Sequence, residues 1–276
     1  MATNLRKTAA NMLLNIEKNG AYINIEMNKL RKEKIHSEKD IRLIGEIVNG
    51  VIKRKITLDY VISLHSSTKL KKIAPYVLNV LRIGVYQLLF MDKIPAGAAC
   101  NEAVKLTKKH GFTGLSGFVN GVARNIARAE DIPYPDEKKN RKEYLSVKYS
   151  MPSTVVEQLV SQYGAGLTEQ ILSAFLQEEI WISVRCMTHI TGTNELKNLL
   201  SDADVIVDEG FYSKDALRLS GMDSPERLPG FSEGLFYIQD ESSMQAVLAA
   251  GLTGEEKVFA PSEDFEISKS PYSVEH

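Results

Sequence analysis

Two segments of helical periodicity, which flank a glycine-bearing turn between residues 95 and 128, constrain the fold of this chain more than any other feature. Apolar residues recur at helical spacing on both sides of the turn, namely Ala99, Ala103 and Leu106 before it and Phe118, Val122 and Ile126 after it. The cations of the segment lie outside these stripes: Lys105, Lys108 and Lys109 on the first helix, and Arg124 and Arg128, which share one face, on the second. The pattern therefore predicts a helical hairpin that buries one side and offers cations on another.

Residues 1–130 as a whole predict an all-α bundle. Apolar periodicity indicates helices ahead of the hairpin over 3–19, 22–34, 41–54, 57–65 and 75–89. The helix that begins at Pro75 is apolar over most of its circumference, which places it at the centre of the core. With the hairpin, this makes six or seven helices with short connections and no strand signal.

The remainder of the chain changes character. Residues 131–148 contain prolines and a charged run without apolar period, which favours a linker. Residues 149–241 mix short helical and strand-like segments and predict a small α+β domain. Residues 242–260 predict one more helix and the entry strand of a further domain, and the polar, acidic stretch 261–276 predicts a disordered tail.

Charge is distributed unevenly along the chain, although the formal net charge is only −1. Residues 1–130 hold 22 Lys and Arg against 10 Asp and Glu, a balance of +12, and the rest of the chain has a balance of −13. A field of positive sign attracts polyanions, and nucleic acid is the obvious candidate. The residues expected to contact phosphate are Arg6, Lys7, Lys53, Arg54, Lys55, Lys105, Lys108, Lys109, Arg124 and Arg128. The alternative interpretation of these cations is an ordinary solvated surface.

The sequence carries no signal for a membrane span, a metal centre or an acid–base pair. Its longest apolar stretch, 76–91, is interrupted by polar residues and falls short of the ~18 residues that a span needs, so the protein is expected to be cytoplasmic. Cys100 and Cys186 lie far apart in no ligand spacing and are interpreted as small buried apolar residues. Asp240 and Glu241 immediately precede a helix and are expected to favour its positive end. No catalytic, cofactor-binding or metal-binding residue is therefore assigned.

Several stretches resemble known families. YVLNVLRIGVYQLLFMDKIP at 76–95 and NEAVKLTKKHGFTGLSGFVNGVARNIAR at 101–128 together resemble the NusB-like domain, an all-α RNA-binding module. Further on, three features resemble the RsmB (Sun, or Fmu) family, namely YSMP at 149–152, the strand that contains Arg185, and RLPGFSEGLFYIQDESSM at 227–244. The resemblance covers effectively the whole folded chain.

The resemblance implies both a domain order and an activity. Proteins of the RsmB family carry a NusB-like domain, a small α/β domain and a Rossmann-like domain. They transfer a methyl group from S-adenosylmethionine to C5 of a cytosine in small-subunit ribosomal RNA. For this chain the resemblance implies ribosomal RNA as the partner, contacted by the helical bundle and by the small α+β domain.

This chain departs from the family where the cofactor loop is expected. The family strand that corresponds to 256–259 leads into an aspartate and an Ala-Ala-Pro-Gly-Gly-Lys loop, whereas Ala-Pro-Ser follows here at 260–262. The two catalytic cysteines of the family lie in its later domain, and neither Cys100 nor Cys186 matches them. We therefore expect a chain truncated before the Rossmann-like domain, which binds RNA but neither holds S-adenosylmethionine nor transfers a methyl group.

Two alternatives remain open at the level of sequence. One is a stand-alone NusB-like module for RNA binding or transcription antitermination, although the match at 227–244 belongs with the methyltransferases. The other is a non-functional product of a frameshifted gene, which the abrupt change at Ala260 motivates.

Overall fold

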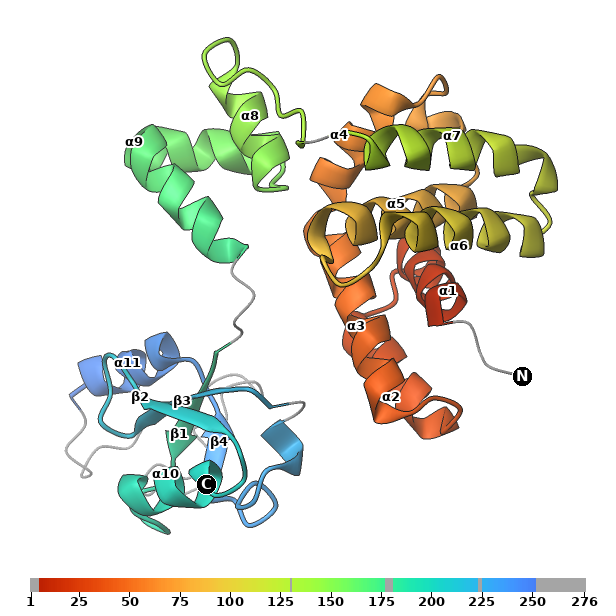
Figure 1. Ribbon diagram of the computed structural model, residues 1–276. Coiled ribbons are helices and arrows are strands. Elements are labelled where there is room, and N and C mark those ends of the chain that lie inside the picture. Colours follow the sequence, from red (N-terminus) through yellow and green to blue (C-terminus); the bar gives the residue numbers. More distant parts are fainter. Residues whose placement is uncertain (1–4, 130, 177–180, 223–224, 252–276) are drawn as a thin grey trace. The chain divides into compact units, whose positions relative to one another are not determined.

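The structure is a computed structural model. It describes residues 5–129, 131–176, 181–222 and 225–251. The chain divides into two compact units, Met1–Leu176 and Gln177–His276. The described residues of the first unit form helices and connecting turns, and those of the second contain a four-stranded sheet (Figure 1).

The bundle predicted for the first 130 residues is confirmed, with seven α-helices in its described part. They are α1 (Leu5–Asn19), α2 (Ile23–Glu33), α3 (Glu38–Lys53), α4 (Lys55–His65), α5 (Pro75–Phe90), α6 (Ala96–Lys109) and α7 (Ser116–Ala127). Single 3-10 turns at Leu70–Lys72 and Thr113–Leu115 precede α5 and α7. At the start of α3, the Ser37 hydroxyl accepts a hydrogen bond from the Asp40 N–H, and the Asp40 carboxylate accepts one from the Ser37 N–H. This capping box satisfies backbone groups that the first turn of a helix leaves unpaired.

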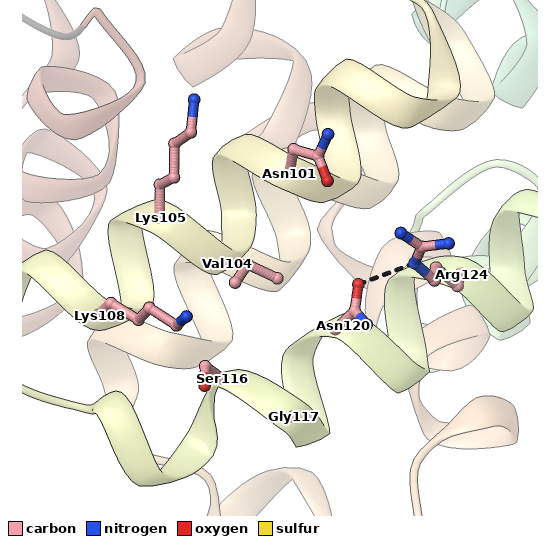
Figure 2. A pocket seen from close by; sticks show the side chains of 8 residues that line it. All are labelled: Asn101, Val104, Lys105, Lys108, Ser116, Gly117, Asn120 and Arg124. Atoms are coloured by element: carbon pink, nitrogen blue, oxygen red, sulfur yellow. Dashed lines mark hydrogen bonds between the residues drawn. The ribbon is translucent and has the colours of Figure 1, made fainter.

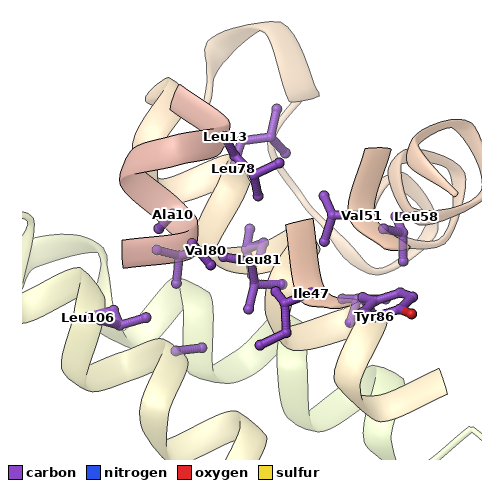
Figure 3. Close-up of a cluster of buried hydrophobic side chains, with 14 of the residues drawn as sticks. Ala10, Leu13, Ile47, Val51, Leu58, Leu78, Val80, Leu81, Tyr86 and Leu106 are labelled. Carbon is purple, nitrogen blue, oxygen red and sulfur yellow. The ribbon is translucent and has the colours of Figure 1, made fainter. Parts of the chain in front are cut away.

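The core of the bundle lies around α5, as its apolar sequence predicts. Helices α1, α3, α4, α6 and α7 all contact α5, and residues 76–87 of α5 are buried without interruption. Figure 3 shows Val80 and Leu81 of α5 in one cluster with Leu13 of α1 and Leu106 of α6. Because each such side chain contributes about 1.5–3 kcal/mol when buried, this cluster fixes where the surface helices α6 and α7 lie.

Gly50 on α3 packs closely against the side chain of Tyr86 on α5. A methyl group at this position would overlap the ring of Tyr86, which is only 7% exposed. We expect Gly50→Ala to destabilise the protein by about 1–3 kcal/mol, because the ring cannot move without disturbing the packed core. Urea unfolding measures the change. The matched control is Gly121→Ala on α7, where a methyl group meets no atom within 4 Å; it should stabilise by about 0.5–1 kcal/mol, and equal effects at both sites would contradict the prediction.

Residues 131–148, which the sequence predicts as a linker, contain a packed helix instead. Helix α8 (Arg141–Lys148) forms there, and its Leu145 and Val147 are buried. The Thr57 hydroxyl on α4 donates a hydrogen bond of 2.5 Å to the Val147 carbonyl, which ties α8 to the bundle. The prediction was wrong because the apolar residues of α8 occupy barely two turns, too few to show a period among the surrounding charges.

The expected domain boundary at residue 149 also differs from the structure. Helix α9 (Ser153–Phe175) consists of two helical arms that meet at Gly164, where φ is +72°. Because α9 packs on α8, it belongs to the first unit, which ends at Leu176. The second unit therefore begins at Gln177, well after the predicted start of the α+β domain at residue 149.

The second unit is a small α+β fold around an antiparallel sheet with the strand order β2-β3-β1-β4. Its elements are β1 (Ile182–Cys186), α10 (Thr193–Ser201), β2 (Ile206–Glu209), β3 (Ala216–Ser220), a 3-10 turn at Pro225–Arg227, β4 (Phe236–Ile238) and α11 (Glu241–Ala249). One face of the sheet packs on α10, where Val184 and Leu217 cluster with Leu196 and Leu200. Side chains alternate along a strand, so Arg218 and its neighbours in register lie on the opposite face.

The helix expected after residue 242 is α11. The Asp240 carboxylate caps it by accepting a hydrogen bond of 2.9 Å from the Ser242 N–H, so the expected role of Asp240 at the positive end of the helix is confirmed. The strand expected over 256–259 and the tail expected over 261–276 lie outside the described residues.

Candidate nucleic-acid interface

A groove of about 440 Å³ lies between α6 and α7, the two helices of the predicted hairpin. Three of the predicted phosphate contacts line it: Lys105 and Lys108 from α6 and Arg124 from α7 (Figure 2). Asn101, Val104, Ser116, Gly117 and Asn120 complete the lining. We call this surface the cationic groove. It brings ammonium, guanidinium, amide and hydroxyl donors together in one concavity, which suits phosphate and ribose oxygens.

The cations of the cationic groove are only loosely held by the fold. The Arg124 Nε donates to the Asn120 Oδ1 at 2.9 Å, which orients the guanidinium along α7. The Lys105 ammonium lies 2.9 Å from a carboxylate oxygen of Glu102, but its side chain is 63% exposed, so this ion pair is worth little. The Lys108 side chain makes no hydrogen bond or ion pair with any described residue. All three cations can therefore turn toward an anionic ligand at small cost.

Four further predicted cations are exposed but do not line the cationic groove. Lys109 and Arg128 lie at the C-terminal ends of α6 and α7, where a positive charge is favoured by the helix dipole without any ligand. Lys7 is on α1 and Lys53 is at the end of α3. The fold thus separates these residues from the three that share the cationic groove.

Two predicted phosphate contacts are used inside the bundle. The Arg6 Nε donates to the Gln87 Oε1 at 2.9 Å, which joins α1 to α5. The guanidinium carbon of Arg54 lies 4.0 Å from the ring centroid of Phe90, in a cation–π contact. Both side chains thus have partners within the first unit, and phosphate contact by them stays a prediction.

Lys55, also predicted to contact phosphate, belongs to a polar network around Arg82. Arg82 is 5% exposed, and its guanidinium meets both carboxylate oxygens of Asp59 at 2.6 and 2.7 Å. It also donates to a Glu17 oxygen at 2.7 Å, and the same oxygen lies 2.6 Å from the Lys55 ammonium. Burial tends to raise the pKa of Glu17, but the hydrogen bond from Lys55 and the charge of Arg82 outweigh it and lower the pKa. The network joins α1, α4 and α5 within the bundle.

The neutral polar residues of the cationic groove were not predicted from the sequence. Asn101 and Ser116 line the groove, and Asn120 orients Arg124. A signal was present, because Asn101 is four residues before Lys105 and Asn120 is four residues before Arg124, so each pair shares a helix face. Neutral residues do not contribute to the charge pattern that indicated the phosphate contacts, so that pattern could not indicate them.

Both cysteines are buried, as the sequence indicates. Cys100 on α6 and Cys186 on β1 are 4% and 2% exposed, and burial raises the pKa of both thiols. A thiol needs a lowered pKa and access to its substrate to act as a nucleophile. Neither cysteine has that environment.

The described residues do not fit S-adenosylmethionine in the manner of the Rossmann-like domain that the resemblance implies. Ligands of such folds bind at the carboxyl ends of parallel strands. The four strands of the sheet pair only in antiparallel fashion, so no such crevice forms among the described residues of 181–222 and 225–251. Among the described residues, no helix is long and apolar enough to cross a membrane, and no group of three or more His, Cys, Asp and Glu is placed to hold a metal ion.

The helical bundle assigns the chain to a family. The NusB family profile matches residues 3–128. The transcription antitermination protein NusB of Ruminiclostridium cellulolyticum is 31% identical over 129 residues, which are 46% of this chain and 88% of that protein. The chain therefore belongs to the NusB family through its first unit.

The similarity continues past the bundle. A probable ribosomal RNA small subunit methyltransferase B of Bacillus subtilis is 31% identical over 257 residues, which cover 93% of this chain and 56% of that protein. Its counterpart in Synechocystis is 29% identical over 259 residues, with 92% and 57% covered. The resemblance to the RsmB family is thus confirmed as homology over nearly the whole chain, and the chain spans about half the length of these relatives.

One solved structure shares the fold across most of the chain. The crystal structure of PH0851 superposes with a TM-score of 0.65 at 18% identity and covers 90% of this chain and 56% of that one. This likeness supports the combination of a helical NusB-like bundle with a small antiparallel sheet.

Proposed function

We propose that this chain is the RNA-binding portion of a ribosomal RNA small subunit methyltransferase and that the cationic groove is its principal RNA contact. The observation that carries the proposal is the convergence of Lys105, Lys108 and Arg124 on one groove of a strongly basic unit. Cations that track phosphates supply most of the sequence-independent affinity for nucleic acid. The names of the longer relatives point to small-subunit ribosomal RNA as the partner.

The expected result is salt-dependent binding of the purified chain to a structured fragment of small-subunit ribosomal RNA. The logarithm of the association constant should fall with the logarithm of salt concentration by about 0.7–0.9 per phosphate contact, so that three cations give a slope of about −2 to −3. Fluorescence anisotropy across a salt series measures this slope. No detectable binding at low salt would count decisively against the proposal.

We also propose that the 276 residues alone do not transfer the methyl group. The proposal is supported by the buried thiols of Cys100 and Cys186 and by the absence of a parallel-strand crevice among the described residues. Isothermal calorimetry with S-adenosylmethionine tests it directly. Binding of S-adenosylmethionine to this chain with micromolar affinity would contradict this proposal, whatever the outcome of the RNA experiment.

A second candidate function is that of a NusB-type antitermination module. It is favoured by the matches to transcription antitermination proteins, including 37% identity over 103 residues with that of Bacillus velezensis. Those matches cover less than half of this chain, whereas the similarity to the Bacillus subtilis methyltransferase covers 93% of it. A competition between ribosomal RNA and an antitermination-site RNA decides between the two candidates by which RNA the chain prefers.

A further inference from the structure

The loop between β2 and β3 exposes two aromatic side chains to solvent, and hydrogen bonds with another element hold its backbone. Phe211 and Tyr212 are 70% and 76% exposed. Their backbone N–H groups, with that of Ser213, donate to the Glu241 carboxylate at 3.0, 2.7 and 3.2 Å. The Tyr212 carbonyl also accepts a hydrogen bond of 2.9 Å from the Gln245 side chain. These hydrogen bonds hold the loop backbone in place, and the two rings remain exposed on that ordered backbone.

A third aromatic side chain extends this surface through an arginine. The guanidinium carbon of Arg218 lies 3.9 Å from the ring centroid of Phe211 and 4.9 Å from that of Trp181. Asp208 at 3.0 Å and the Glu209 carbonyl at 3.2 Å hold the guanidinium in place. Because Leu217 and Leu219 face α10, Arg218 lies on the sheet face away from that helix. We call Trp181, Phe211, Tyr212 and Arg218 the aromatic platform.

The charges next to the aromatic platform are compatible with RNA, although the second unit is acidic as a whole. Asp208 is paired with Arg218, Glu209 is paired with Lys197 at 3.0 Å, and Glu241 is satisfied by backbone N–H groups. Lys214, on the same loop, is exposed and makes no hydrogen bond or ion pair with any described residue. The carboxylate of the adjacent Asp215 likewise makes no hydrogen bond or ion pair with any described residue, so these two opposite charges leave this part of the loop without net charge.

We propose that the aromatic platform stacks unpaired bases of the RNA that the first unit binds. The inference rests on the proposed function and extends it to the second unit. Exposed, pre-ordered aromatic rings and arginine planes accept the flat faces of unstacked bases, and they do so with little regard to sequence. Because the two units share one chain, RNA held in the cationic groove raises the effective concentration of its single-stranded segments at the aromatic platform. Stacking does not neutralise phosphates, so its contribution to the binding free energy does not depend on salt concentration.

Truncation of the exposed rings tests the proposal. Phe211→Ala and Tyr212→Ala should each weaken binding to a single-stranded RNA oligonucleotide by about tenfold, with the salt slope of the wild type unchanged. Binding to a blunt duplex of the same sequence should stay within about twofold, because its bases are already stacked. Tyr212→Phe and Phe211→Tyr should restore wild-type affinity, since each keeps a flat ring.

The matched control is Tyr22→Ala, which removes a ring of similar exposure, 71%, from the first unit. It should leave RNA affinity unchanged. If Phe211→Ala and Tyr212→Ala keep full affinity for single strands while the wild type binds normally, the stacking proposal falls and the proposed function stands; the platform is then better explained as a protein-binding surface. A fall in affinity accompanied by a shallower salt slope would overturn stacking in favour of phosphate contact. A wild type that binds no RNA would overturn both.

Discussion

Reversing two charges in the cationic groove, with Lys108→Glu and Arg124→Glu in one chain, is expected to weaken RNA binding by about a hundredfold. The double variant removes two phosphate contacts and places two carboxylates against the phosphates that they attracted, and like charges brought together in this way cost several kcal/mol. The slope of affinity against salt should fall in magnitude by about 1.4–1.8, since two contacts of about 0.7–0.9 each are lost. Anisotropy across the salt series gives both numbers.

A matched variant separates the cationic groove from the overall charge of the unit. Lys32→Glu with Lys39→Glu changes the net charge equally, and both lysines are exposed on α2 and α3, with side chains that make no hydrogen bond or ion pair to any described residue. This control should lose less than about threefold in affinity, because exposed charges more than ~10 Å from the ligand are screened. Equal losses in the two variants would show that net charge, and not the groove, governs binding.

Replacing Arg82 with Met is expected to cost about 3 kcal/mol of stability. The substitution leaves Asp59 and Glu17 without their shared cation in a setting where Arg82 itself is 5% exposed. Removing one partner of a buried ion pair costs about 3–5 kcal/mol, and the partial exposure of the two carboxylates favours the lower end. Urea unfolding measures the change in stability, with the same slope of unfolding free energy against urea concentration for both proteins.

The control for this variant is Lys55→Met, which removes the other cation of the network. The Lys55 side chain is 45% exposed, so the loss should stay below about 1 kcal/mol. A loss for Arg82→Met no larger than that for Lys55→Met would mean that the network is worth no more than a surface ion pair.

The same network predicts how stability depends on pH. The pKa of Glu17 is lowered in the folded state, so its contribution is complete above the ordinary carboxyl pKa of ~4.3 and is lost as pH falls through the lower folded value. Arg82→Met removes the positive charge that counteracts the effect of burial on Glu17, so the pKa of Glu17 should rise. The loss of stability between neutral and acidic pH should therefore be smaller in the variant than in the wild type. Stability measured between pH 7 and pH 3 for both proteins tests the sign.

The sequence predicted the bundle well because its helices carry long apolar periods. The helix predicted to begin at Pro75 is α5, and the helix predicted over 41–54 is α3. Helix α8 was missed because Leu145 and Val147 are its only buried apolar residues. Its stability comes from tertiary contacts that no local pattern records, and the domain boundary was misplaced for the same reason.

The candidate site was predicted only in part, for a related physical reason. A charge count finds cations but not their partners, and the partner of Arg6 is 81 residues away at Gln87. Lys105, Lys108 and Arg124 converge because the turn before α7 folds two helices together, which periodicity did predict. The aromatic platform depends on the register of β2 and β3, which brings Arg218 opposite Asp208, and register could not be derived from strands this short.

The anchoring of the loop at 211–213 by Glu241 has a thermodynamic consequence for the second unit. One carboxylate at the first turn of α11 holds three successive backbone N–H groups, so the loop and the helix start form a single cooperative element. Any ligand that favours the ordered loop also favours the ordered helix start, and by linkage whatever steadies the helix strengthens binding at the loop by the same factor. The Glu241 side chain thus couples the order of the loop at 211–213 to the order of the first turn of α11.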